Sequence, residues 1–134
     1  MGILDMFKKS ETKRSDVPYS VRTTFLPVRL GAHKIESSDM CIFVKNLTAD
    51  PILTSVVVSV PRALSVDRNG IPKAKEVRLD FLQSGEEKEI SVPIWSNVTT
   101  DVGTYPVQIK VIAHYRSYSY VLNSVRINSD LRAV

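Results

Sequence analysis

Residues 101–112 read Asp-Val-Gly-Thr-Tyr-Pro-Val-Gln-Ile-Lys-Val-Ile. From Tyr105 onward, large apolar residues alternate with residues that are mostly polar, and the β-branched content is high. A period of two is typical of a β-strand that buries one face. The stretch therefore predicts a strand that presents Val107, Ile109 and Val111 to a core.

The same alternation recurs along most of the chain. Turn-forming residues separate the runs, and no segment after residue 16 has a helical period. Strands that are apolar on one face must bury that face against a second sheet when no helix is present. The predicted fold class is therefore all-β, a seven-stranded antiparallel immunoglobulin-like sandwich with a short N-terminal tail or helix. The predicted strands are residues 21–30, 39–45, 55–60, 76–81, 89–95, 105–112 and 118–128.

The pattern also makes three predictions about individual residues. In the last run the inward set changes parity between Leu122 and Val125, which predicts a β-bulge. In the fourth run, Leu79 and Phe81 alternate with charged residues, which predicts that both face the core. Pro93 has no N–H to contribute to a central strand, so we expect it at a strand end or a bulge.

The motif Asp101-Val102-Gly103-Thr104-Tyr105 resembles the Asp-x-Gly-x-Tyr entry to strand F of immunoglobulin-like domains. The resemblance implies that the Tyr105 hydroxyl bonds to backbone upstream. Residues 39–127 also resemble the immunoglobulin-like modules found beside glycosidases and adhesins in bacteria and archaea, the alpha-galactosidase-associated and CARDB-type domains. The residues that carry this wider resemblance are Ile42, Val44, Asn46, Val56, Val58, Val60, Pro61, Gly85, Glu86, Gly103 and Tyr105.

The resemblance implies an architecture and not a function, because this sandwich serves many unrelated functions. Val107 stands where antibody domains have the strand-F cysteine, and Trp95 lies in the fifth predicted strand and not the third. Cys41 is the single cysteine, so an intramolecular disulfide is excluded. The fold must therefore be stabilised by packing alone.

Composition places the chain among soluble proteins of one domain. It has 134 residues, 43% of them hydrophobic and 24% charged. No apolar run approaches the ~18 residues of a membrane-spanning helix, and no secretory signal is recognisable, so we expect a cytoplasmic protein. Eighteen basic residues against fourteen acidic ones give a net charge of +4, but the basic residues are scattered rather than clustered.

Residues 1–16 differ in composition from the domain predicted for residues 17–134. Ile3, Leu4 and Phe7 have the spacing of one side of a short helix, and Lys8 and Lys9 follow them. Three interpretations remain open for this segment. It is a disordered tail, an element that packs on the domain or a partner, or a contact with an anionic membrane surface through Lys8 and Lys9.

Residues that could perform catalysis are few. His33 and His114 are the only histidines, and Cys41 lies in mid-strand without a helix N-terminus to activate it. No metal-ligand spacing and no phosphate-binding glycine loop occurs. We therefore expect no enzymatic activity, no cofactor, no bound metal and no small-molecule substrate.

Surface residues suggest a binding role instead. Strand parity predicts that Phe43 and Trp95 project from the outer face of one sheet, and Val57 and Ile112 from the outer face of the other. Aromatic residues are enriched at interface cores, and edge strands accept further strands. These features favour a non-enzymatic module that recognises another protein, or itself, through a sheet face or an edge strand.

An alternative interpretation is a peripheral module on an anionic membrane or on nucleic acid. The basic N-terminal segment, with Lys13 and Arg14 after Lys8 and Lys9, would provide part of the charge. Residues 114–120 read His-Tyr-Arg-Ser-Tyr-Ser-Tyr, in which aromatic rings adjoin Arg116 and are suited to stacking on bases. The competing interpretation is that Tyr118 and Tyr120 pack against the sheet.

Overall fold

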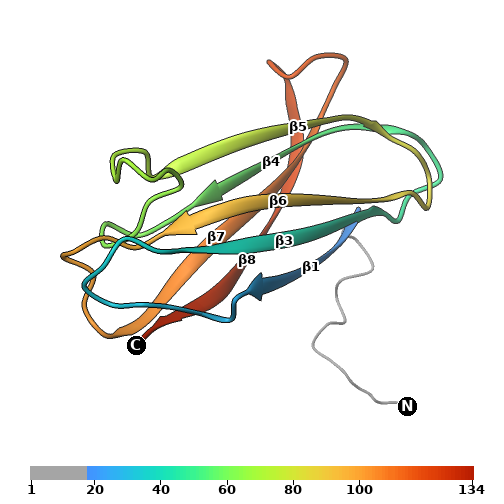
Figure 1. Ribbon diagram of the computed structural model, residues 1–134. Helices are drawn as coiled ribbons and strands as arrows, with labels where there is room; N and C mark the ends of the chain where they lie inside the picture. The colour runs from blue at the N-terminus through green and yellow to red at the C-terminus, as the bar shows by residue number, and fades with distance from the viewer. Residues whose placement is uncertain (1–17) are drawn as a thin grey trace, which may run out of the picture.

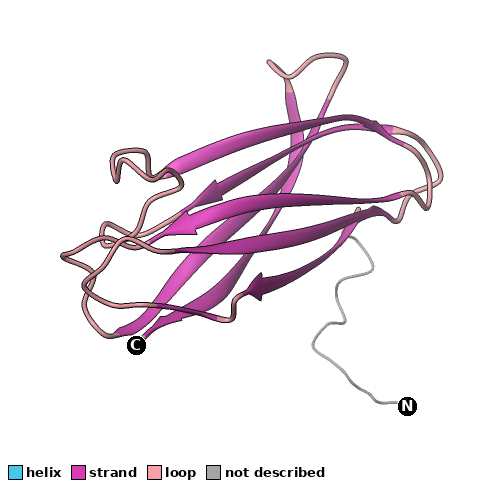
Figure 2. Ribbon diagram, viewed as in Figure 1, coloured by secondary structure: helices cyan, strands magenta, loops and turns pink. Residues whose placement is uncertain are grey.

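The computed structural model describes residues 18–134, and in this range it contains strands and loops and no helix (Figures 1 and 2). The alternation of apolar and polar residues explains this, because each alternating run forms a strand with one buried face. The eight strands of the described residues are β1 (Tyr19–Leu26), β2 (Arg29–Leu30), β3 (Ser37–Asn46), β4 (Ile52–Ser59), β5 (Ala74–Leu82), β6 (Glu87–Trp95), β7 (Gly103–His114) and β8 (Val121–Ala133).

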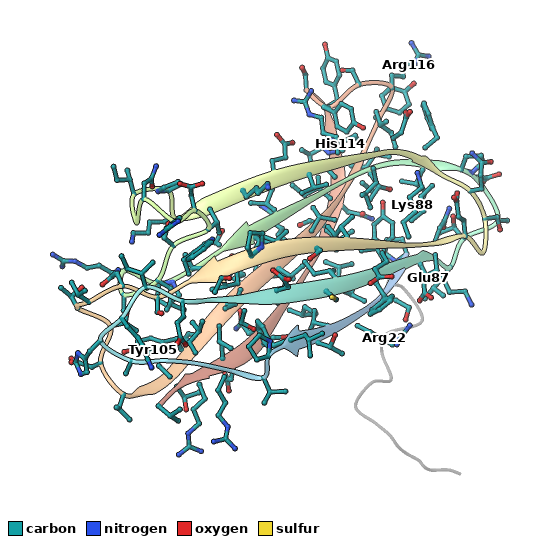
Figure 3. The ribbon with its side chains drawn as sticks, viewed as in Figure 1. Arg22, Glu87, Lys88, Tyr105, His114 and Arg116 are labelled. Atoms are coloured by element: carbon teal, nitrogen blue, oxygen red, sulfur yellow. The ribbon has the colours of Figure 1, made fainter. Side chains whose placement is uncertain are left out.

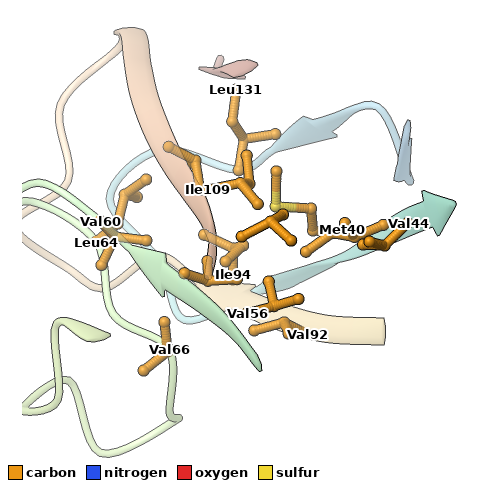
Figure 4. Packing of buried hydrophobic residues seen from close by; sticks show 14 of the residues in the cluster. Met40, Val44, Val56, Val60, Leu64, Val66, Val92, Ile94, Ile109 and Leu131 are labelled. Atoms are coloured by element: carbon orange, nitrogen blue, oxygen red, sulfur yellow. The ribbon is translucent and has the colours of Figure 1, made fainter. Parts of the chain in front are cut away.

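Two sheets of unequal width pack face to face. One has three strands in the order β1-β3-β6, and the other has five in the order β2-β8-β7-β4-β5. Their inner faces form one hydrophobic core, which Figure 4 shows from close by. The largest side chains buried there are Leu30, Met40, Ile42, Leu64, Leu82, Ile94, Ile109 and Leu131. The predicted all-β sandwich of two sheets is confirmed.

The first predicted strand, residues 21–30, is two strands in the structure. Pro27 has no N–H for a ladder, and the chain changes sheets at this residue. β1 pairs with β3 in the narrow sheet, whereas β2 pairs with β8 in the wide one. Because β2 runs parallel to β8, the wide sheet is mixed. The prediction of seven strands, all antiparallel, is therefore not met by residues 18–134.

The tyrosine corner implied by the resemblance is present at the start of β7. The Tyr105 hydroxyl donates a 2.7 Å hydrogen bond to the carbonyl oxygen of Asp101, four residues upstream. Tyr105 itself pairs with Leu131 of β8 and packs against the core. The hydroxyl therefore fixes the loop that brings the chain from β6 into β7.

Asn46 fixes the opposite end of the sandwich. This residue is fully buried at the end of β3, and its amide donates to the carbonyl oxygens of Asp50 and Leu82, each at 2.8 Å. Its side-chain oxygen accepts from the backbone N–H and the hydroxyl of Thr48. One side chain thus joins the turn between β3 and β4 to the end of β5, and so joins the two sheets.

Two bulges modify the predicted register. One lies opposite the Ala113–His114 step, where Leu122 is left without a partner, close to the predicted position. The other lies in β5, where Leu79 has no partner in β4 and Asp80 has a positive φ of 63°. This second bulge turns Phe81 outward, so the prediction that Phe81 faces the core is wrong.

Pro93 lies within β6, and the expectation of a strand end or bulge is also wrong. The backbone N–H and carbonyl of Trp95 face away from β3, because both bond to Ser65 in the segment between β4 and β5. Pro93, two residues earlier, therefore lacks its N–H on the same outward side. A proline in this position of an edge strand costs no bond of the β3–β6 ladder.

A hydroxyl pair bridges the two sheets inside the core. Tyr19 of β1 and Thr54 of β4 share a 2.7 Å hydrogen bond, and both residues are buried. Burial raises the pKa of the Tyr19 hydroxyl above its ordinary value of 10.0, and the bond to Thr54 offsets part of that rise. The pKa is therefore higher in the folded chain than in the unfolded one.

Replacing Tyr105 with phenylalanine tests the tyrosine corner. Loss of one net hydrogen bond predicts a decrease of about 1 kcal/mol in the free energy of unfolding, measured by urea denaturation. Tyr115→Phe is the matched control, since the Tyr115 side chain is half exposed and its hydroxyl makes no hydrogen bond within residues 18–134. Equal effects of the two changes would contradict the structural role of Tyr105.

The raised pKa of Tyr19 predicts how the free energy of unfolding changes at alkaline pH. A raised folded-state pKa contributes stability that is present below the unfolded value and lost as pH rises through the folded value. The free energy of unfolding should therefore fall more steeply as the pH rises above about 10 in the natural chain than in Tyr19→Phe. Parallel pH profiles for the two proteins would contradict this assignment.

Candidate protein-interaction surface

The structure separates Phe43 and Trp95, which both lie half-buried on the outer face of the narrow sheet. Phe43 pairs with Glu89, whereas Trp95 pairs with Ser37, six residues further along β6. At strand spacing this separates them by roughly 20 Å. The two aromatics therefore do not form one cluster, and whether either binds a partner stays a prediction.

Phe43 is already in contact with charged neighbours. The guanidinium of Arg22 lies 4.5 Å from the centre of the Phe43 ring and also pairs with the Glu87 carboxylate at 3.3 Å. Figure 3 shows Arg22 and Glu87 approaching one another across the strands. The positive charge of Arg22 on this face is therefore balanced by the Glu87 carboxylate.

Val57 and Ile112 lie on the outer face of the wide sheet, both half-buried. Val57 pairs with Lys110 of β7, and Ile112 is two residues further along that strand, so the two side chains are diagonal neighbours. The structure brings this predicted pair together. The two pairs of predicted binding residues lie on opposite outer faces, so all four cannot contact one flat surface.

The hairpin that joins β7 to β8 rises beyond the body of the sandwich, and Figure 3 labels His114 and Arg116 there. Tyr118 folds back from it onto the wide sheet. Its hydroxyl accepts the backbone N–H of Asp80 at 3.0 Å, the Arg78 guanidinium lies 4.5 Å from its ring centre, and its ring meets His114 edge-on. Tyr118 is therefore engaged within the chain and is not a free stacking surface.

The residues that could perform chemistry do not converge. Cys41 lies on the outer face of β3 and His114 on the outer face of β7, in different sheets. His114 Nε2 bonds to the Ser55 hydroxyl at 2.7 Å, and Nδ1 has no partner in the described part of the chain. His33 lies in a loop, 3.5 Å from the Asp101 carboxylate.

Among residues 18–134, no three His, Cys, Asp or Glu side chains gather in a way suited to a metal ion. The same residues include no helix of the length and apolarity that crossing a membrane requires. The predicted contacts of the N-terminal segment, Ile3, Leu4, Phe7, Lys8 and Lys9, lie outside the described residues.

The side of the sandwich formed by β5 and β6 is poorly suited to accept another strand. The β5 bulge interrupts one edge, and the Lys88 ammonium donates to the Leu79 carbonyl at 2.9 Å. Pro93 removes an outward N–H from the other edge, and Ser65 pairs with Trp95 at its end. Bulges, lysines and prolines are the usual features that protect edge strands.

The opposite side exposes the long edge of β8. Among residues 18–134, the short strand β2 is the neighbour beyond β8, and it pairs with two of the thirteen residues of β8, Arg132 and Ala133. Val134 N–H donates to Leu30 and its carbonyl accepts from Ala32, so the backbone groups of Val134 point toward β2. By the two-residue repeat of a strand, the backbone groups of Asp130, Asn128, Arg126 and Ser124 point the same way, and the described part of the chain places no strand there.

Apolar side chains accompany this edge. Val125 and Ile127 face inward but are only half-buried, and Tyr120, Val121 and Leu122 are each at least 60% exposed. A side-chain hydrogen bond between Thr23 of β1 and Ser129 marks where the edge meets the narrow sheet. We call residues 121–130 of β8 the open edge. Sequence reasoning missed it because strand order cannot be read from alternation alone.

No family model and no curated protein matches this chain. Among solved structures, it is similar to the CARDB domain of a Pyrococcus furiosus protein described in complex with di-metal ions, with a TM-score of 0.51 and 21% identity, over 87% of this chain and 85% of that one. It is also similar to an ASH/PapD-like domain of human CEP192, with a TM-score of 0.48 and 16% identity, over 100% and 96% of the two chains.

The CARDB likeness supports the immunoglobulin-like sandwich and, at this identity, the fold alone. The predicted resemblance to CARDB-type domains is thereby confirmed at the level of architecture. Neither structure bears on the alpha-galactosidase-associated domains, so that part of the resemblance stays a prediction.

The contacts of Tyr118 predict that it anchors the hairpin. Tyr118→Ala removes an aromatic contact, a cation–π contact and a hydrogen bond, and should lower the free energy of unfolding by about 2 kcal/mol. Tyr120→Ala is the matched control, because the Tyr120 side chain is 65% exposed and should change stability by less than about 0.5 kcal/mol. Equal losses in urea denaturation would contradict the anchoring role.

Proposed function

We propose that this chain is a non-enzymatic binding module that recognises an extended segment of another protein along the open edge of β8. The observation that supports this is the row of outward backbone N–H and C=O groups from Ser124 to Asp130, which have no strand beside them within residues 18–134. Such groups form hydrogen bonds with an added strand, and this is a recurring mode of peptide recognition.

The open edge is a better candidate than the sheet faces. Phe43 is covered in part by Arg22, and Trp95 lies where Ser65 pairs with its backbone. β1 is also an edge strand, but it is shorter than β8 and its Arg22 already has an acidic partner. Within the described residues, β8 combines backbone groups that no strand pairs with, inward residues that are half-buried, and exposed apolar residues at one end.

Replacing Asn128 with proline tests the proposal, because the change removes one backbone N–H, and that N–H points away from β7 toward the position of an added strand. Asn128→Pro should leave the β7–β8 ladder intact and abolish strand addition, whereas Asn128→Ala removes the side chain but keeps the N–H. Each full-length variant would serve as bait in lysate of the source organism. We expect a partner retained by the natural chain and Asn128→Ala but lost by Asn128→Pro, and that partner should slow hydrogen exchange of the Arg126 and Asn128 amides.

The outcome is interpretable only if Asn128→Pro still folds, which its urea unfolding curve shows. Retention of the same partner by folded Asn128→Pro would place recognition elsewhere, on a sheet face or on the N-terminal segment. Slow exchange of the Arg126 and Asn128 amides in the isolated protein would also contradict an open edge.

A further inference from the structure

Arg126 is the one basic residue of the open edge, and its neighbours do not balance its charge. It lies directly opposite Lys110 of β7, and Lys110 lies opposite Val57 of β4. Like charges on directly opposed residues of a sheet destabilise one another. Within residues 18–134, neither Arg126 nor Lys110 forms an ion pair.

The other outward side chains of this edge have a different character. Ser124 and Asn128 are neutral, and Asp130 is acidic. Asn128 also lines a shallow hollow of about 320 Å³ with Ser59, Gln108 and neighbouring prolines, all uncharged. On this face, a strand added beside β8 would therefore lie next to a positive charge at Arg126, neutral side chains at Ser124 and Asn128, and a negative charge at Asp130.

The inner side of the same edge is apolar. Val125 and Ile127 pack against the core cluster but remain half-buried, because the three-stranded sheet beneath is narrower than the five-stranded one. Val21 and Phe25 of β1 are half-buried on the facing sheet. Inward side chains of an added strand would lie against these four residues, so burial there favours apolar side chains.

We infer that the partner segment is an amphipathic β-strand with apolar residues on alternate positions and an aspartate or glutamate placed beside Arg126. This inference rests on the proposed function and names the chemistry of the partner. The carboxylate pairs with Arg126 across the new strand boundary and relieves the repulsion from Lys110. Asp130 disfavours a second carboxylate four residues further along, so the charge pattern also sets the register.

A pair of synthetic peptides tests the inference on the full-length protein. Each peptide is about nine residues long and alternates valine, which would face the core, with threonine, which would lie on the outer face. The central threonine is replaced by glutamate in one peptide and by lysine in the other. Binding is followed residue by residue from amide chemical shifts of β8 during titration. The glutamate peptide should bind about five- to tenfold more tightly than the lysine peptide, and the difference should shrink at high salt.

Charge reversal at Arg126 is the decisive variant. Arg126→Glu should reverse the preference, so that the lysine peptide binds more tightly, while Arg132→Glu is the matched control at a position that β2 already covers. A preference for glutamate that survives in Arg126→Glu would overturn the inference. So would equal binding of both peptides along β8, although the proposed function would then stand.

Two further outcomes would assign the edge to a different occupant and overturn the inference. Shifts of β8 amides that depend on protein concentration without peptide would identify a second copy of the chain. Shifts of the same amides on changing Ile3 and Phe7 to aspartate, at any concentration, would identify the N-terminal segment. The amides of Arg126 and Asn128 exchange fast if the edge is open. If they do so and neither peptide perturbs β8, the result would count against the proposed function as well.

Discussion

The two sheets differ in width, and this difference determines which inner side chains are fully buried and which edge is exposed. Apolar inner faces must cover one another, and three strands cannot cover five. Where coverage is complete, as at Met40 and Ile109, side chains are fully buried. Where it ends, as at Val125 and Ile127, inward residues stay half-buried. The boundary of the core is thus set by the number of strands and not by the hydrophobicity of the residues.

The two lateral sides of the sandwich deal with their edges differently. On the side of β5 and β6, a bulge, Lys88 and Pro93 each remove or occupy backbone groups that an added strand would need. On the side of β1 and β8, the protection that residues 18–134 provide is confined to β2 and its two residues. The asymmetry matters because unprotected edges invite self-association, and proteins retain them where a partner strand is accepted.

The fold was largely predictable, because it follows from local signals. The period of two and the Asp-x-Gly-x-Tyr motif require only neighbouring residues, and Tyr105 bonds to Asp101 as the motif implies. The bulge in β5 was not predictable, because Leu79 and Phe81 alternate regularly and only the pairing with β4 displaces one of them. Parity correctly placed Phe43 and Trp95 on the same face, but the distance between them depends on strand register, which alternation does not give.

The open edge depends on information that is still less local. Within residues 18–134, its exposure follows from Pro27, which prevents the first run from continuing as one strand and leaves only Arg29 and Leu30 paired beside β8. Continued through residues 23–28, β2 would pair with Asn128 and Arg126, and because none of those six residues is acidic, the repulsion between Arg126 and Lys110 would remain unrelieved. With β2 this short, no strand of residues 18–134 lies beside Arg126, and an acidic side chain of a partner strand can occupy that position. The same proline that made the predicted strand count incorrect therefore also creates the surface on which recognition is proposed.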